Sequence, residues 1–236
     1  MVTIREITGK SDPATDRTIA QIQSILRVSL PGLRPAEIES IPTRVKSRRY
    51  SIFETRLFVA ESPEGICLGF ALLLYCPTVG FCFLDYIATN PAVRSTGIGS
   101  LLYEHTRAEA RKYGSLGLFF ECSPDEPDEC SSPELLAENA SRLRFYERWG
   151  ARPIINNQYT LEISPGEKDL PYLVYDALGP SPTVSTQQIR SVVKAILVPK
   201  YSYLCSPEYI ESVVESFSDR QINLRPFRYG ILASCA

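Results

Sequence analysis

The stretch Arg94-Ser95-Thr96-Gly97-Ile98-Gly99 follows an apolar run at residues 81–89 and opens a helical pattern at residues 98–113. Glycine at its fourth and sixth positions lets the backbone fold tightly and brings bare N–H groups close to an anion. The helix that follows adds unpaired amides and a partial positive charge of about half a unit. We therefore predict that this turn binds a phosphate or pyrophosphate group.

Two common nucleotide-binding patterns do not fit this turn. No Lys-Ser or Lys-Thr pair follows a second glycine at the spacing that a P-loop needs. Leu102 stands where a dinucleotide-binding fingerprint would have its third glycine. The residues on either side of the turn must therefore indicate which protein family the turn resembles.

That context resembles the acetyl-CoA motif of the GNAT N-acetyltransferase superfamily: a hydrophobic strand, a short bridge and then Arg/Gln-x-x-Gly-x-Gly/Ala, as in residues 84–99. A second motif of the superfamily, Asn…Phe-Tyr-x-Arg-x-Gly-Ala, is reproduced by Asn139, Phe145, Tyr146, Arg148, Gly150 and Ala151. Arg142 departs from it, since many members carry alanine there. The resemblance covers about residues 2–178.

The resemblance implies a mixed α/β fold with a mixed sheet, the GNAT acyl-CoA N-acyltransferase fold, in a domain at residues 1–178. We expect strands at residues 3–7, 57–61, 66–75, 81–89 and 116–122, with a closing hairpin at 154–163 and 170–178. Helices are expected after an N-cap at Asp16, at 36–47 with an interruption at Pro42, at 98–113 and at 139–149. Residues 179–236 form a helical extension with two apolar stripes behind Ser185 and Ser206, which either pack on the core or form a homodimer or partner interface.

The resemblance also implies acetyl-CoA as the co-substrate, without a metal. The backbone around Ile87 and Thr89 would pair with the pantetheine arm, and residues 95–100 would hold the pyrophosphate through amides. The cofactor-binding residues expected on this basis are Ile87, Ala88, Thr89, Arg94, Ser95, Thr96, Gly97, Ile98, Gly99, Ser100, Asn139 and Tyr146.

Asp85 is the first candidate catalytic residue, because alternate residues of a strand share a face and Asp85, Ile87 and Thr89 are so spaced. At pH 7 a lysine-type amine costs about 4–5 kcal/mol to deprotonate, whereas an α-amino group costs about 1 kcal/mol. Asp85 would act as base, or would bind the ammonium and relay its proton through water. The alternative is a carboxylate that caps or pairs inside the core.

Tyr146 and Glu121 complete the catalytic candidates. Tyr146 would donate a proton to the departing thiolate, as its position in the family motif implies, or would be a core aromatic in a stripe with Leu143 and Trp149. Glu121 ends the strand after the cofactor helix and would be a second carboxylate on the acceptor side. Residues 124–134 between them are acidic and rich in proline, and either attract cationic substrates or form a mobile solvated loop.

Composition limits the other functions. A net charge of −2 gives no reason to expect nucleic acid or an anionic membrane as a partner, and the basic run at residues 44–49 is interpreted as a solvated helix end. No apolar stretch reaches about 20 residues and the amino terminus lacks a signal-peptide core, so a cytoplasmic location is expected. The seven dispersed cysteines are expected in the core, and the single histidine, His105, lies on an apolar stripe, which excludes a site with several histidines.

We therefore expect an N-acetyltransferase that transfers an acetyl group from acetyl-CoA to an amine, of a small molecule or a protein, by direct attack on the thioester. The alternative is a non-catalytic acyl-CoA-binding module that acts through a protein partner. A third interpretation is a component of a larger protein-modifying system.

Overall fold

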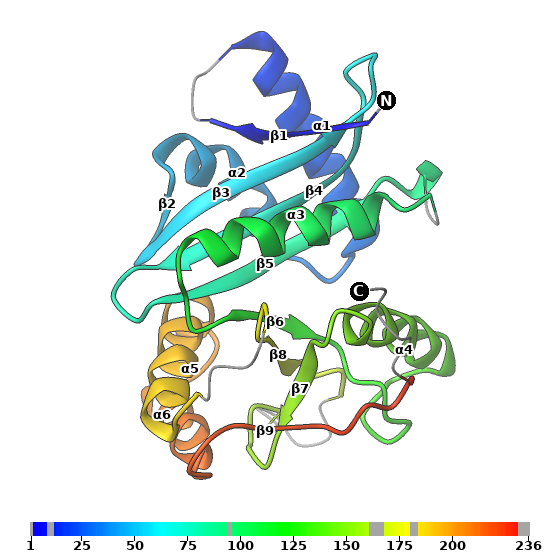
Figure 1. Cartoon of the computed structure of the whole chain (residues 1–236). Coiled ribbons are helices and arrows are strands. Elements are labelled where there is room, and N and C mark those ends of the chain that lie inside the picture. The colour runs from blue at the N-terminus through cyan, green and yellow to red at the C-terminus, as the bar shows by residue number, and fades with distance from the viewer. Residues whose placement is uncertain (1, 9–11, 94–95, 161–167, 180–183, 231–236) are drawn as a thin grey trace. The chain divides into compact units, whose positions relative to one another are not determined.

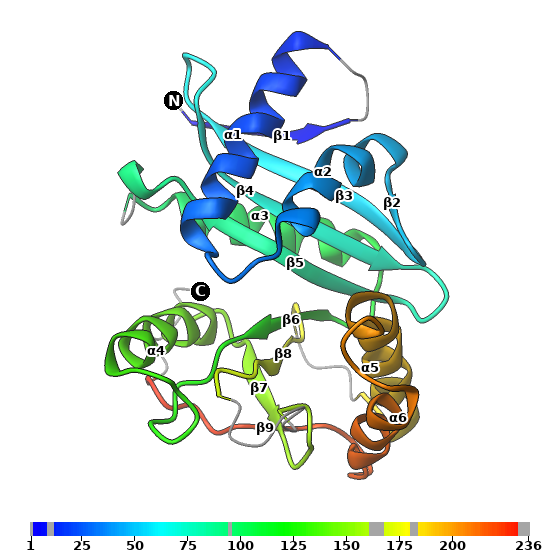
Figure 2. The ribbon, with the colours of Figure 1, turned by 180° about the vertical axis from the view of Figure 1, so that it is seen from behind.

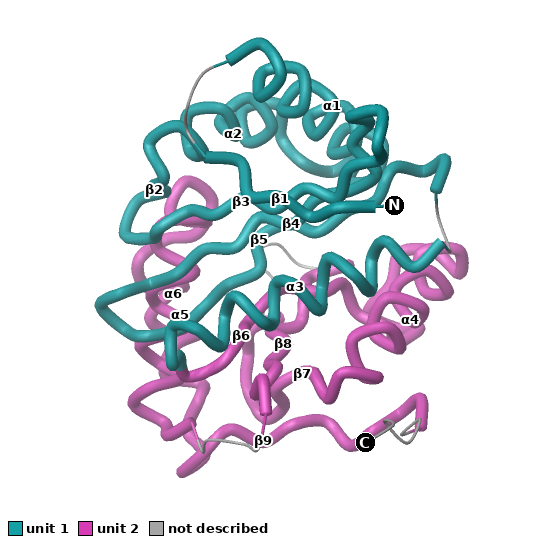
Figure 3. The backbone as a smooth tube through the Cα atoms, turned by 45° about the horizontal axis from the view of Figure 1, so that its top comes forward, with its two compact units in different colours: residues 1–115 teal, residues 116–236 magenta. Residues whose placement is uncertain are grey.

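The computed structural model describes residues 2–8, 12–93, 96–160, 168–179 and 184–230. The chain forms two compact units, residues 1–115 and residues 116–236 (Figure 3). Both units combine helices with an antiparallel sheet.

The sheet of the first unit has the strand order β1 (Thr3–Ile7), β3 (Phe53–Glu61), β4 (Cys67–Cys76) and β5 (Phe81–Thr89). Each neighbouring pair is antiparallel, and β2 (Arg49–Tyr50) pairs with the start of β3. The first and last strands have the predicted bounds, whereas β3 starts four residues before the predicted 57–61.

Helices cover both faces of this sheet (Figures 1 and 2). α1 (Pro13–Ser29) and α2 (Pro35–Ser47) pack on one face, and α3 (Ile98–Lys112) lies on the other. The predicted N-cap of the first helix is wrong: Asp12, not Asp16, accepts the N–H groups of the first turn. The core under α1 and α2 contains Ile7, Ile22, Ile25, Leu26, Ile38, Ile41, Val45, Leu57, Val59, Cys67, Phe70 and Leu72.

Pro42 does not interrupt α2 as predicted, because another helix compensates for its missing N–H. A proline inside a helix leaves the carbonyl four residues earlier without its usual donor. That carbonyl belongs to Ile38, and it accepts a hydrogen bond of 2.9 Å from the Gln23 side chain of α1. This hydrogen bond therefore links α1 to α2 one turn before the proline.

The second unit has the strand order β6 (Leu118–Cys122), β8 (Tyr172–Asp176), β7 (Arg152–Ile155) and β9 (Asn223–Leu224), again with antiparallel neighbours. The pairing of β7 with β8 confirms the predicted closing hairpin, although β7 ends earlier and residues 161–163 lie outside the described part. α4 (Pro133–Glu147) starts six residues before the prediction, because Ser132 accepts the N–H of Leu135 and caps it. Part of the acidic segment is thus the first turn of a helix.

The C-terminal extension belongs to this second unit. α5 (Thr186–Tyr201) starts at the predicted capping box of Ser185 and Gln188, and α6 (Pro207–Ser216) starts after Ser206. The apolar side chains of the two helices are buried within the chain, including Ile189, Val192, Val193, Ile196, Ile210, Val213 and Val214. The boundary at residue 178 stays a prediction. Among the described residues, no helix has both the length and the apolar character to cross a membrane.

Candidate functional site

The predicted anion-binding turn connects β5 to α3. It contains the short helix η1 (Pro91–Val93) and ends at Gly97, whose φ of 88° lies in the left-handed region that strains other residues. A Cβ atom at Gly97 would meet no described atom within 4 Å, so the turn faces open space. Arg94 and Ser95, two of the predicted cofactor contacts, lie outside the described residues.

The start of α3 suits an anion. Among the described residues, no side chain caps its first turn, whereas α1, α4, α5 and α6 are capped by aspartate or serine. The first N–H groups of a helix need an acceptor, and a phosphate can supply one. The backbone N–H groups of Ile98, Gly99 and Ser100 belong to this first turn, and N–H groups in that position can donate to an anion.

The end of β5 leads directly into this turn. A Cβ on Gly99 would lie 3.9 Å from the Thr89 side chain, and a Cβ on Gly69 of β4 would lie only 2.8 Å from the Ala88 carbonyl oxygen. A groove of about 410 Å³ borders the turn on the side of α1. It is lined by Gln21, Ser24, Ile25, Val28, Cys67, Asn90, Pro91 and Ala92.

Asp85 does not share a face with Ile87 and Thr89, and this prediction is wrong. The register of β4 with β5 shifts at Asp85, because Leu72 pairs with Tyr86 and Leu73 pairs with Leu84. Asp85 is thus the extra residue of a β-bulge, and a bulge breaks the alternation of side chains. Its carboxylate contacts α2, whereas Thr89 lies beside the start of α3.

On α2 the carboxylate meets Arg44. The distance from Arg44 Nη2 to Asp85 Oδ2 is 2.5 Å, and the two side chains are 6% and 2% exposed. The guanidinium carbon lies 4.1 Å from the ring centroid of Tyr50 and 5.9 Å from that of Tyr86. Burial lowers the pKa of Arg44, but the charge and hydrogen bond of Asp85 outweigh it and the pKa is raised overall.

The sequence analysis missed Arg44, which it placed in a solvated helix end. The signal was present, since Arg44 stands three residues after Ile41 and next to Val45 on the buried stripe of α2. A charged residue on an apolar stripe needs a partner of opposite charge. Asp85 is that partner. This agrees with the alternative interpretation of Asp85 as a carboxylate that is paired in the core.

The carboxylate of Glu121, in the second unit, is also bound by other side chains of the chain. Its two carboxylate oxygens accept hydrogen bonds from the hydroxyls of Tyr159 at 2.8 Å and Tyr201 at 2.7 Å. Lys200 Nζ lies 3.4 Å from the second oxygen. Burial and the charge of Glu121 raise the pKa of both tyrosines, so they remain protonated donors. This cluster ties α5 to β6.

The residues of the second motif lie on α4. Tyr146 is 9% exposed and its ring centroid is 4.4 Å from that of Phe120. Burial raises the pKa of Tyr146, which keeps the phenol protonated. Asn139 is buried and donates a hydrogen bond of 2.8 Å to the Pro124 carbonyl, so it fixes the acidic segment to α4.

The acidic segment is engaged by the C-terminal end of the chain, the red ribbon beyond α6 in Figure 1. Asp125 accepts two hydrogen bonds from Arg225, at 2.6 and 3.1 Å, and one from the Tyr229 hydroxyl at 2.6 Å. Arg228 pairs with Glu126, and the backbone N–H groups of residues 228 and 229 donate to Glu147. Two carboxylates of this segment, those of Asp125 and Glu126, thus bind the chain's own cations.

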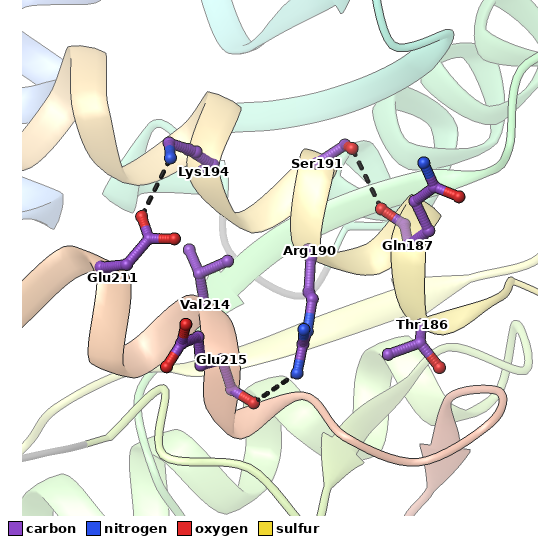
Figure 4. A pocket seen from close by; sticks show the side chains of 8 residues that line it. All are labelled: Thr186, Gln187, Arg190, Ser191, Lys194, Glu211, Val214 and Glu215. Carbon is purple, nitrogen blue, oxygen red and sulfur yellow. Dashed lines mark hydrogen bonds and ion pairs between the residues drawn. The ribbon is translucent and has the colours of Figure 1, made fainter.

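A second groove, of about 390 Å³, lies between α5 and α6 (Figure 4). Its cations are also bound within the chain: Lys194 Nζ lies 2.9 Å from Glu211, and Arg190 donates to the carbonyl oxygens of Glu215 and Phe217. The geometry therefore offers no cation to an anionic ligand there.

The histidine and the cysteines that the sequence predicted in the core are packed among other residues. His105 packs on Phe58 at a ring distance of 4.8 Å, and burial lowers its pKa. The six described cysteines are buried and form no disulfide with one another, and Cys235 lies outside the described residues. The described ranges contain no group of three or more His, Cys, Asp or Glu side chains that could hold a metal ion.

Comparison with known proteins identifies the family. Residues 54–150 match the model of an acetyltransferase (GNAT) domain. The matched part of the chain is thus similar to GNAT acetyltransferase domains, and the chain has the GNAT fold. No curated protein sequence matches the chain.

Solved structures agree on the fold. An aminoglycoside 6'-N-acetyltransferase complexed with coenzyme A superimposes with a TM-score of 0.54 at 15% identity, over 76% of this chain and 99% of that one. The aminoglycoside 6'-N-acetyltransferase of Enterococcus faecium gives 0.51 at 15% identity, over 76% and 99%. Tetrahymena GCN5 gives 0.52 at 11% identity, again over 76% and 99%.

Proposed function

We propose that this protein transfers an acetyl group from acetyl-CoA to an amine. The observation that carries the proposal is the start of α3, where a left-handed glycine borders open space and no described side chain caps the first turn, at the position of the superfamily's acetyl-CoA motif. Acetyl-CoA supplies an activated thioester, which the amine attacks directly. The coenzyme A complex of a structural relative supports this choice of co-substrate.

The residues proposed to hold acetyl-CoA lie at the end of β5 and at the start of α3. Ile87, Ala88 and Thr89 offer backbone groups to the pantetheine arm, and residues 96–100 offer N–H groups to the pyrophosphate. Tyr146 is proposed as the proton donor to the thiolate, because its buried phenol stays protonated at neutral pH.

A binding experiment tests the placement of the cofactor. Gly97→Ala forces a side chain into the left-handed region, which costs about 1–2 kcal/mol of stability, and it disturbs the N–H groups of the turn. Gly114→Ala is the matched control, because Gly114 also has a positive φ and open space but follows the other end of α3. We expect calorimetry to detect weaker binding of acetyl-CoA only for Gly97→Ala. Equal affinities in the two folded variants would contradict the placement.

A thiol-release assay tests the reaction. With acetyl-CoA and a panel of amines, the enzyme should release free thiol, whereas a non-catalytic binder would bind acetyl-CoA without releasing it. Tyr146→Phe removes only the hydroxyl, so it should preserve affinity for acetyl-CoA and lower turnover at every pH. Unchanged turnover in the folded variant would make Tyr146 a packing residue.

A further inference from the structure

Direct attack on a thioester needs an amine without its extra proton, so the protein must either remove that proton or select an amine that lacks it. Asp85 is a poor candidate for removing it. It is 2% exposed and its oxygen lies 2.5 Å from the guanidinium of Arg44. An adjacent fixed cation favours the carboxylate anion and lowers its affinity for a proton.

Protonation of Asp85 would also leave Arg44 charged in a buried place without its counterion. A buried charge that loses its partner is strongly destabilising. The rings of Tyr50 and Tyr86 lie near the guanidinium, at 4.1 and 5.9 Å, and help to keep it in place. The ion pair therefore resists the proton transfer that a base would have to accept.

Glu121 is constrained in a similar way within its own unit. Two tyrosine hydroxyls donate to its two oxygens, and Lys200 lies 3.4 Å from one of them. These contacts engage both carboxylate oxygens within the chain. Both carboxylates that the sequence proposed as bases are thus bound by other residues.

We infer that the acceptor is an amine of which an appreciable fraction is neutral near pH 7, typified by the α-amino group of an amino acid or peptide, and that Arg44 maintains this preference by pairing with Asp85. This inference rests on the proposed acetyltransferase function. In the reaction the N–C bond forms and the C–S bond breaks. The attacking nitrogen loses one proton to water, and the departing thiolate gains one.

The size of the preference follows from the free amine alone. An α-amino group has a pKa near 8.0 and a lysine side chain near 10.4, so at pH 7 the neutral fractions differ by about 200-fold. At pH 9 most of the α-amine is neutral, and the difference shrinks to about 20-fold. An enzyme without a base should reproduce both ratios.

The experiment compares alanyl-alanine amide, which has only an α-amine, with Nα-acetyl-lysine amide, which has only an ε-amine. Thiol release gives kcat/KM for each at pH 7 and at pH 9. We expect the α-amine to be preferred by about 200-fold at pH 7, with a tenfold smaller ratio at pH 9. A ratio near one at pH 7, or one that does not change with pH, would overturn the inference. If none of the amines leads to thiol release, that result would instead contradict the proposed function.

Variants test the role of Arg44. Asp85→Asn should leave the ratio unchanged, since Asp85 is not the base; a selective loss of ε-amine activity would overturn the inference. Arg44→Gln removes the positive charge beside Asp85, so it should raise ε-amine activity relative to α-amine activity by tenfold or more, and Arg44→Gln/Asp85→Asn should abolish that gain. Arg5→Gln is the matched control, because it breaks the ion pair with Glu61 in the same unit. If Arg44→Gln does not fold, the wild-type ratios and Asp85→Asn still decide the question.

Discussion

Replacing Arg225 with methionine should destabilise the second unit by about 3 kcal/mol. The Asp125 side chain is 0% exposed, and Arg225 donates two of the three hydrogen bonds that its carboxylate accepts. Removal of one partner of a buried ion pair costs about 3–5 kcal/mol. The lower end applies, because the hydroxyl of Tyr229 remains and Arg228 lies 3.6 Å away.

The loss can be followed by the single tryptophan of the chain, Trp149, which lies just after α4 in the same unit. A loss of about 3 kcal/mol corresponds to a melting temperature about 6–12 °C lower, since each kcal/mol shifts it by about 2–4 °C at this size. With a slope of about 2 kcal/mol per M, the midpoint in urea should fall by about 1.5 M.

Arg228→Met is the matched control. It removes a pair with Glu126 in which both side chains are well exposed and a longer contact of 3.6 Å with Asp125, but neither hydrogen bond that Arg225 donates to Asp125, so the expected loss is about 1 kcal/mol. Equal losses for Arg225→Met and Arg228→Met would refute the reasoning. So would strictly additive losses for Asp125→Asn and Arg225→Met, because the double variant removes both halves of one buried pair. Substitution of Asp125 or Glu126 in the acidic segment should change stability and leave KM for a basic acceptor unaltered, because these two carboxylates already pair with arginines of the chain.

Three further outcomes are expected. Gly69→Ala should lower both stability and acetyl-CoA affinity, because its Cβ would lie 2.8 Å from the Ala88 carbonyl oxygen and would displace the end of β5. Thermal melting measures the stability and calorimetry measures the affinity. An unchanged affinity for acetyl-CoA would contradict this prediction. Gln23→Leu should cost about 1–3 kcal/mol, because it leaves the carbonyl that precedes Pro42 by one turn without a donor, and Pro42→Ala in the same chain should restore most of the loss in urea unfolding. Burial raises the pKa of Asp125, but hydrogen bonds and nearby arginines lower it overall, so its stabilisation is present above about pH 4 and is lost as the pH falls through the lowered pKa. The difference in melting temperature between the wild type and the Arg225 variant should therefore shrink below about pH 4.

The local features of the sequence were sufficient to predict most elements of the first unit and the anion-binding turn. The strand at 81–89 and the capping box at Ser185 have the predicted positions, because apolar periodicity and capping are properties of neighbouring residues. The predicted starts at Asp16 and residue 139 were wrong because more than one residue could serve as a cap. Which residue caps the helix depends on which side chain the rest of the fold places beside the N–H groups of the first turn.

The sequence by itself indicated the GNAT fold, through two motifs, and the turn at the start of α3, because a left-handed glycine and the helix that follows it are encoded within a few residues. Only the tertiary structure decided the state of the candidate bases. Asp85 meets Arg44 from 41 positions earlier, and Glu121 meets Tyr201 from 80 positions later. A β-bulge turns the first carboxylate toward α2, and no periodicity rule places such an extra residue. The chemistry of a carboxylate depends on which charges and donors lie within a few ångströms, and for these two residues folding brings those groups from distant parts of the chain.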